Sequence, residues 1–147
     1  MNQSILVIMK LLLTFFVLWA AHASAQQGTL VLSVTGIDMK KGGNLAAAIF
    51  TRENFPKPGK QLMASEATVT SPSMELVITD VPPGDYGIAV FQDVDRNRQL
   101  KTNFVGLPQE LTGFSNDARI HFGPPSFEDA RITVIKDKET FATIILR

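Results

Sequence analysis

The sequence predicts an all-β domain, a sandwich of two antiparallel sheets with about seven short strands. Three observations lead to this prediction. After Gln26, apolar and polar residues alternate with a period of two, which places successive side chains on opposite faces of a sheet. Glycine and proline interrupt the alternation at short intervals, as tight turns require. No stretch after Gln26 has the long amphipathic repeat of a helix.

The N-terminus has the pattern of a cleaved secretion signal. Lys10 is the only charged residue among the first 37, and it precedes an apolar run that ends at Ala21. Ala23-Ser24-Ala25 follows with the A-x-A spacing that a signal peptidase recognises. We therefore expect residues 1–25 to be removed and residues 26–147 to form one secreted or periplasmic domain. The alternative is an uncleaved anchor, because the apolar stretch from Ile5 approaches the roughly 17 residues that span a bilayer.

Composition restricts how the exported domain is stabilised and what it binds. The chain has no cysteine, so disulfides cannot stabilise it and the hydrophobic core must suffice. A domain of about 120 residues buries roughly two thirds of its unfolded surface, which is enough. Without Lys10 the chain carries 13 basic and 14 acidic residues and no basic cluster, so we expect no nucleic-acid partner. A monomer with no membrane span after cleavage is expected.

Alternation and turn residues define the predicted strands in chain order. The first strand, around residues 29–35, has Leu30, Leu32 and Val34 facing inward, and a turn at 36–43 makes an antiparallel hairpin with the second strand at 44–50. The alanines at 46–48 favour a helix by propensity, but the run is short and is enclosed by glycine and proline. Further strands are predicted at 66–70, 74–78, 86–92, 130–135 and 140–146.

Two turns and one strand can be predicted in more detail from their residues. Pro83 and Gly84 suit the second and third positions of a type II turn, because proline has a negative φ and glycine accepts a positive one. The strand at 86–92 is almost entirely apolar, which indicates a central strand buried on both faces. The charged residues 136–139 are predicted to form the hairpin turn between the last two strands.

The segment between Asp93 and Asp129 breaks the alternation. Loops of this length are usually functional or disordered. Large apolar residues argue against disorder, and they are Phe104, Leu107, Phe114, Phe122 and Phe127. We therefore expect a long ordered insertion whose aromatic side chains hold it against one end or edge of the sandwich.

Several motifs of the chain resemble one exported bacterial family. They are Pro83-Gly84-Asp85-Tyr86, Gln92-Asp93-Val94-Asp95-Arg96-Asn97, residues 103–110, Gly113-Phe114-Ser115-Asn116 and residues 122–127. In order and spacing they are similar to the family labelled domain of unknown function 2141, over nearly the whole exported domain. The resemblance implies a secreted or periplasmic β-sandwich similar to transthyretin-like and regulatory domains, and it implies no established activity.

An acidic loop at the start of the insertion is the candidate metal site. Its oxygen-bearing side chains alternate as the ligands of a Ca²⁺ loop do, and they are Asp93, Asp95, Asn97 and Gln99. The resembled family typically reads Asp-x-Asn-x-Asn-Gly-x-x-Asp here, whereas this chain has Arg98 at the glycine and Lys101 at the last aspartate. Arg98 enters a left-handed turn less readily than glycine, and Lys101 places positive charge beside a cation. We therefore prefer a structural loop held by side-chain hydrogen bonds to backbone N–H groups, with Ca²⁺ as the only cofactor indicated.

No set of residues makes a convincing catalytic site. His121 is the only histidine after residue 25, and a serine nucleophile needs a nearby base. Residues 113–117 lack the second glycine of a nucleophile elbow, so Ser115 and Asn116 are expected to form a turn. Glu110 and Asp117 would serve as an acid–base pair on a glycan only at a suitable separation, which sequence spacing does not determine.

The sequence therefore predicts a non-enzymatic binding or structural module of the cell envelope, with an envelope protein or a glycan as its partner. The alternatives are a small envelope enzyme acting on glycan or peptide, and a degenerate calcium-binding module. Long ordered loops on a rigid sandwich commonly carry function, so we place the interaction surface on the insertion. Its expected residues are Phe104, Glu110, Phe114, Ser115, Asn116, His121 and Phe127.

Overall fold

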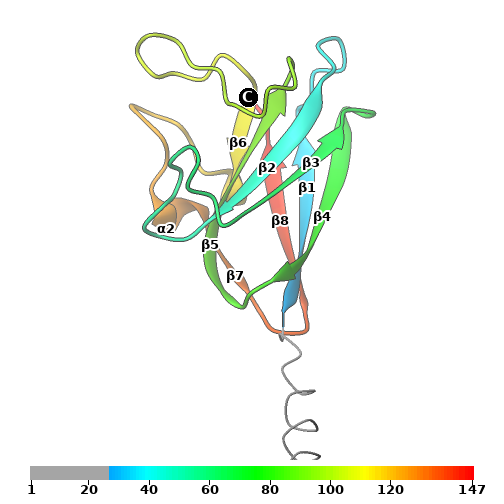
Figure 1. Cartoon of the computed structure of the whole chain (residues 1–147), viewed down its shortest axis with the longest axis vertical. Helices are drawn as coiled ribbons and strands as arrows, with labels where there is room; N and C mark the ends of the chain where they lie inside the picture. The colour runs from blue at the N-terminus through cyan, green and yellow to red at the C-terminus, as the bar shows by residue number, and fades with distance from the viewer. Residues whose placement is uncertain (1–26) are drawn as a thin grey trace, which may run out of the picture.

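A computed structural model describes residues 27–147 and shows two β-sheets packed face to face (Figure 1). The strands are β1 (Gly28–Thr35), β2 (Asn44–Phe50), β3 (Met63–Thr68), β4 (Ser73–Val81), β5 (Gly84–Asp93), β6 (Thr112–Phe114), β7 (Arg131–Val134) and β8 (Glu139–Ile145). Two short helices, η1 (Ser115–Asp117) and α2 (Phe127–Ala130), lie between β6 and β7. The predicted all-β sandwich is confirmed. The predicted signal at residues 1–25 lies outside the described residues.

The order of strands differs from the two predicted hairpins. The smaller sheet has the order β4-β1-β8, and the larger has β3-β2-β5-β6, with β7 also paired to β5. β1 pairs antiparallel with β4 and parallel with β8, so residues 36–43 cross between sheets and the hairpin with β2 is wrong. The turn at 136–139 also joins different sheets, so the second hairpin is wrong. Alternation determines which face a side chain occupies and leaves the partner strand open.

The turn before β5 also differs from its prediction. It connects β4 in one sheet to β5 in the other, and Gly84 has a φ of 155°. A type II turn requires a φ of about 80° at this position, so the predicted turn type is wrong. The buried Tyr86 closes this corner, because its hydroxyl donates a hydrogen bond to the carbonyl of Pro82 at 2.9 Å.

The inner faces of the two sheets enclose one hydrophobic core. Leu30, Leu32 and Val34 face it and are fully buried, as predicted. β5 is a central strand, and Ile88 and Val90 are also fully buried in this core. The alanine-rich segment is a strand over residues 44–50, which confirms the choice of strand over helix.

Ser115 fills a gap along one side of β5. β7 pairs with residues 84–87 of β5 and β6 pairs with residues 89–91, so the ladder is interrupted at Ile88. There the buried Ser115 hydroxyl accepts a hydrogen bond from the Ile88 N–H at 3.0 Å and donates one to the Ala130 carbonyl. The side chain thus satisfies buried backbone groups that would otherwise lack a partner.

A second hydrophobic cluster lies on the outer face of the five-stranded sheet. Phe55 is its centre, with ring centroids 6.0 Å from Phe50, 5.9 Å from Phe114 and 6.0 Å from Phe127, all edge to face. Phe114 and Phe127 therefore hold the insertion to the sandwich, as predicted. Phe104 and Phe122 are both fully exposed, so the prediction that they hold the insertion to the sandwich is wrong.

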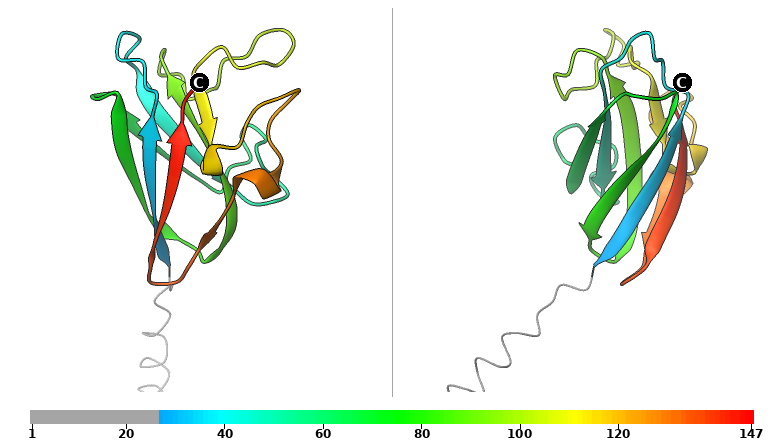
Figure 2. Two further views of the ribbon diagram at one scale, coloured as in Figure 1. Left: turned by 180° about the vertical axis from the view of Figure 1, so that it is seen from behind. Right: turned by 90° about the vertical axis from the view of Figure 1, so that its right-hand side faces the viewer.

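Three loops project from the same side of the sandwich, beyond the five-stranded sheet (left in Figure 1, right in the left view of Figure 2). They are the β2–β3 loop (51–62), the β5–β6 loop (94–111) and the η1–α2 loop (118–126). Within residues 27–147 no helix has the length and apolar character needed to cross a membrane.

Candidate functional site

The acidic loop is a turn held by its own side chains. Asp93 ends β5 and is fully buried, and its carboxylate accepts hydrogen bonds from the N–H groups of Asn97 at 3.1 Å and Arg98 at 2.7 Å. Asp95 Oδ1 also accepts from the Asn97 N–H at 3.2 Å, and Asn97 Oδ1 accepts from the Gln99 N–H at 2.7 Å. This is the structural loop that the sequence favoured, made by short polar side chains that bond to nearby backbone.

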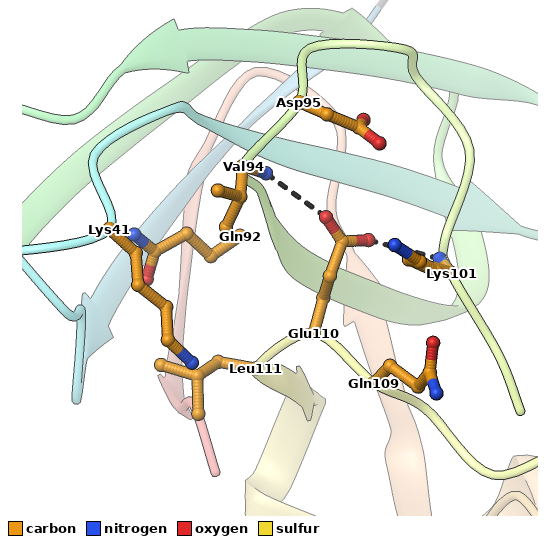
Figure 3. Close-up of a pocket in the computed structure, with 8 residues that line it drawn as sticks. All are labelled: Lys41, Gln92, Val94, Asp95, Lys101, Gln109, Glu110 and Leu111. Carbon is orange, nitrogen blue, oxygen red and sulfur yellow. Dashed lines mark hydrogen bonds between the residues drawn. The ribbon is translucent and has the colours of Figure 1, made fainter.

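Glu110 joins this loop from the far end of the insertion. Figure 3 shows its carboxylate between the N–H groups of Val94 and Lys101, each donating at 3.0 Å. Oxygens of Asp93, Asp95 and Glu110 all lie within 4.8 Å of one another. Glu110 is largely buried and clamps the two ends of the loop while lining a pocket beside it, so its predicted place on the interaction surface stays a prediction. No local pattern links Glu110 to residues so distant in sequence.

Arg98 occupies the position where the resembled family has glycine. Its φ is 62°, in the left-handed region, which costs a non-glycine residue about 1–2 kcal/mol. Its guanidinium reaches the edge strand β3, where Nη2 lies 2.6 Å from Glu66 Oε1 and Nε lies 3.3 Å from Oε2. The hydrogen bond to Glu66 raises the pKa of Arg98. Arginine thus keeps the glycine conformation and adds a tether between the loop and β3.

A small polar pocket of about 350 Å³ lies beside the carboxylates. Lys41 and Lys101 line it together with Asp95 and Glu110 (Figure 3). The carboxylate oxygens suit Ca²⁺, whereas the two ammonium groups oppose a cation. The geometry therefore fits Ca²⁺ only in part, and the metal site remains a prediction.

We expect Ca²⁺ to leave the stability of the protein unchanged. Both oxygens of Asp93 and both oxygens of Glu110 already accept backbone hydrogen bonds, so the turn is closed by the chain itself. Thermal melting of the full-length chain with millimolar Ca²⁺ and with excess chelator checks this, with Mg²⁺ as the matched control. A rise of several degrees with Ca²⁺ alone would identify a calcium loop.

A larger groove of about 1000 Å³ lies over the outer face of the five-stranded sheet. Its floor is made of small side chains on three adjacent strands, Ala46 and Ala48 on β2, Ala64 on β3 and Ala89 on β5. Leu107 and Ile120, on two of the projecting loops, form part of its walls, and Pro58 lines it from the third. Most of the surface that faces the groove is therefore apolar.

The register of the sheet arranges the floor in two rows. Ala64, Ala48 and Ala89 stand opposite one another across the strands, and Phe114 continues this row. Glu66, Ala46, Phe91 and Thr112 form the neighbouring row. The alanines lower the floor, because bulkier side chains at these positions would fill the space above the sheet. In the sequence the alanine run indicates a strand, and nothing local shows that its alanines form the floor of a groove.

The predicted interaction residues do not form a single surface. Phe104 and His121 are exposed on the projecting loops, so their predicted role stays a prediction. Asn116 is exposed but donates a hydrogen bond to the Arg131 carbonyl at 2.7 Å, and the half-buried Phe127 lies under the guanidinium of Arg52.

Two further predicted interaction residues are buried. Phe114 packs in the second cluster but also lines the groove, so its predicted role stays a prediction, whereas Ser115 is fully buried at the gap in β5 and does not lie on the surface. Phe114 ends β6, and a strand of only three residues is too short to show an alternation of apolar and polar residues in the sequence.

A family model described as "Uncharacterized protein conserved in bacteria (DUF2141)" matches residues 32–142. This match confirms the resemblance seen in the sequence motifs. No curated protein and no solved structure matches the chain.

Proposed function

The chain belongs to DUF2141, the family of uncharacterised proteins conserved in bacteria, and we propose that it is an exported, non-enzymatic binding module of the bacterial cell envelope. The groove over the five-stranded sheet is its ligand site, and the three projecting loops form the walls of that site. The N-terminal pattern supports export, because one basic residue, an apolar run and an A-x-A sequence follow one another there.

The groove is the observation that carries the binding role. Its volume of about 1000 Å³ is at the upper end of small-molecule sites, which occupy roughly 300–1,000 Å³ and are lined mainly by apolar side chains. The groove lies on a rigid sheet and under irregular loops, and loops on rigid scaffolds commonly carry binding sites.

The surroundings of the candidate catalytic groups support a non-enzymatic role. The Ser115 hydroxyl is buried and bonded to backbone groups, so it is not positioned to attack a ligand. Glu110 is buried with both oxygens bonded to N–H groups. The hydrogen bond from Arg147, with Nη2 to Oδ2 at 3.0 Å, lowers the pKa of Asp117, which disfavours this carboxyl as a proton donor.

The decisive experiment captures envelope components with a chain whose loop tip is shortened. Residues 103–107 form a closed turn, in which the Asn103 side chain accepts from the N–H groups of Val105 and Leu107. Replacing this turn by Gly-Ser should leave the acidic loop intact and remove Leu107 from the site, together with the exposed Phe104 on the same turn. We expect the full-length chain to retain an envelope component and the shortened chain to lose it.

The matched control replaces the exposed turn at 136–138, which connects β7 to β8. Retained proteins, glycans and lipids are identified by mass spectrometry for all three chains. A binding role in the groove is excluded when the wild-type chain retains no envelope component above background. A binding role in the groove is also excluded when the chain with the replaced 103–107 turn and the control chain with the replaced 136–138 turn show the same loss of binding to the retained component.

A further inference from the structure

We propose that the groove binds a long-chain fatty acid, with the acyl chain along the alanine floor and the carboxylate among basic residues of the loops. This inference rests on the proposed function and assigns a chemical class to the ligand of the same site. The arrangement of the floor, the pairing of its backbone and the charge of the surrounding loops carry it.

The floor suits an unbranched apolar chain. Ala64, Ala48 and Ala89 line up across three strands, and Phe114 closes this row against the second hydrophobic cluster. Three alanines on adjacent strands make an apolar strip about 10 Å across, and methylene groups laid on it are removed from water. Phe104 and Phe122 are fully exposed and lie within two residues of Gly106 and Ile120, which line the groove.

The backbone of the floor disfavours a peptide. β2 is paired with β3 on one side and with β5 on the other, and β5 is paired with β2 and with β6. The N–H and C=O groups of the central floor strands are therefore used within the sheet. A peptide lying across them would bury backbone polar groups without partners, which is costly. An acyl chain has no backbone polar groups to bury, so the floor favours an acyl chain over a peptide.

The charge around the groove favours an anionic head group. The three loops, residues 51–62, 94–111 and 118–126, carry seven basic and three acidic side chains. The rest of residues 27–147 carries six basic and eleven acidic side chains, so the basic residues of this slightly negative region are concentrated on the three loops. Such an uneven distribution attracts an anion to these loops. Three of the seven basic residues form ion pairs with acidic residues outside the loops, Arg52 with Glu128, Arg98 with Glu66 and Arg119 with Asp117. The attraction therefore comes mainly from Lys57, Lys60, Arg96 and Lys101, whereas Arg98 is the basic residue that lines the groove itself.

Calorimetric titration of the full-length chain with saturated fatty acids of eight, twelve and sixteen carbons tests the proposal. Each acid is kept below the concentration at which it forms micelles. We expect the affinity to rise about fourfold for each methylene that is buried, since burial of one CH₂ contributes about 0.8 kcal/mol. The alcohols of equal length should bind several-fold more weakly, and this difference should shrink in high salt, because exposed charges are screened.

Two substitutions that fill the floor provide the structural test. Ala46→Phe and Ala64→Phe place a ring where the acyl chain would lie, and Ala64 is on an edge strand, where the larger side chain is easily accommodated. Both should reduce the affinity for the sixteen-carbon acid at least tenfold. Thr143→Phe, at an exposed position on the other sheet, is the matched control and should bind like the wild type. Thermal melting confirms that each variant is folded.

Several results would overturn the proposal. They are no binding heat with any acid, an affinity independent of chain length, equal binding of acids and alcohols at low salt, and unchanged binding in both alanine variants. Binding only to vesicles of anionic phospholipid would also overturn it, because the ligand would then be a membrane surface. If Ala46→Phe abolishes capture of an envelope protein or glycan while fatty acids do not bind, the acyl ligand is wrong and the binding role stands.

Discussion

Replacing Phe55 by alanine should lower the free energy of unfolding by about 3–5 kcal/mol, the usual cost of removing a buried aromatic ring. Phe55 is buried and makes edge-to-face contacts with three other phenylalanines, and each such pair adds roughly 0.5–1.5 kcal/mol beyond area burial. It also lies directly over Gly87, where an added Cβ would be 2.5 Å from Phe55 Cδ2. The ring therefore occupies the space that the absence of a side chain at Gly87 leaves open. Urea denaturation of the full-length chain measures the loss.

The chain provides two controls for this substitution. Phe104→Ala and Phe122→Ala remove the same ring from fully exposed positions, so each should change stability by less than about 0.5 kcal/mol. A second readout is the groove, because the β2–β3 loop that Phe55 anchors forms one of its walls. Ligand binding by Phe55→Ala should be weakened even at temperatures where the variant is folded. If Phe55→Ala is no less stable than Phe104→Ala, the second cluster does not hold the loops.

Replacing Gly43 by alanine should destabilise the protein by about 3 kcal/mol or more. Gly43 has a φ of 85°, and a Cβ at this position would lie 2.3 Å from the Asp93 carbonyl oxygen and 2.7 Å from Val94 Cα. Both are backbone atoms of the segment where β5 enters the acidic loop, so neither can move without displacing Asp93. The substitution should also increase hydrogen exchange at Asn97 and Arg98, whose N–H groups bond to Asp93.

The preceding glycine is the matched control for Gly43. Gly42 also has a positive φ, 61°, but apart from its two chain neighbours no heavy atom among residues 27–147 lies within 4 Å of the position of its Cβ. Gly42→Ala should therefore cost only the left-handed strain of about 1–2 kcal/mol. Equal losses for the two substitutions would mean that the approach of Gly43 to Asp93 contributes nothing to stability.

Most strands of the fold were predictable from the sequence, but the pairing of these strands within the two sheets was not. Residues 44–50 were predicted as a strand, because alternation and the flanking glycines are local signals. The hairpin of β1 with β2 was wrong, since β1 instead pairs in parallel with β8 at the other end of the chain. β6 was missed, because a strand of three residues contains too little alternation to detect.

In the candidate site, too, local contacts were predictable from the sequence and contacts between distant residues were not. The turn made by Asp93 and Asn97 was predictable, because short polar side chains bond to backbone a few residues away. The closing role of Glu110 was not, since its partners Val94 and Lys101 are 16 and 9 residues earlier in the chain. The groove was missed because its alanine floor comes from three strands.

Residue patterns along the chain were enough to predict a β-sandwich after Gln26, the inward-facing residues Leu30, Leu32 and Val34, and the family. These properties depend on patterns that are local in the chain. Strand pairing, the closure of the acidic loop by Glu110, and the groove over Ala46, Ala48, Ala64 and Ala89 became visible in the folded arrangement alone. These depend on contacts between distant segments, and such contacts arise from packing that alternation and turn residues do not specify.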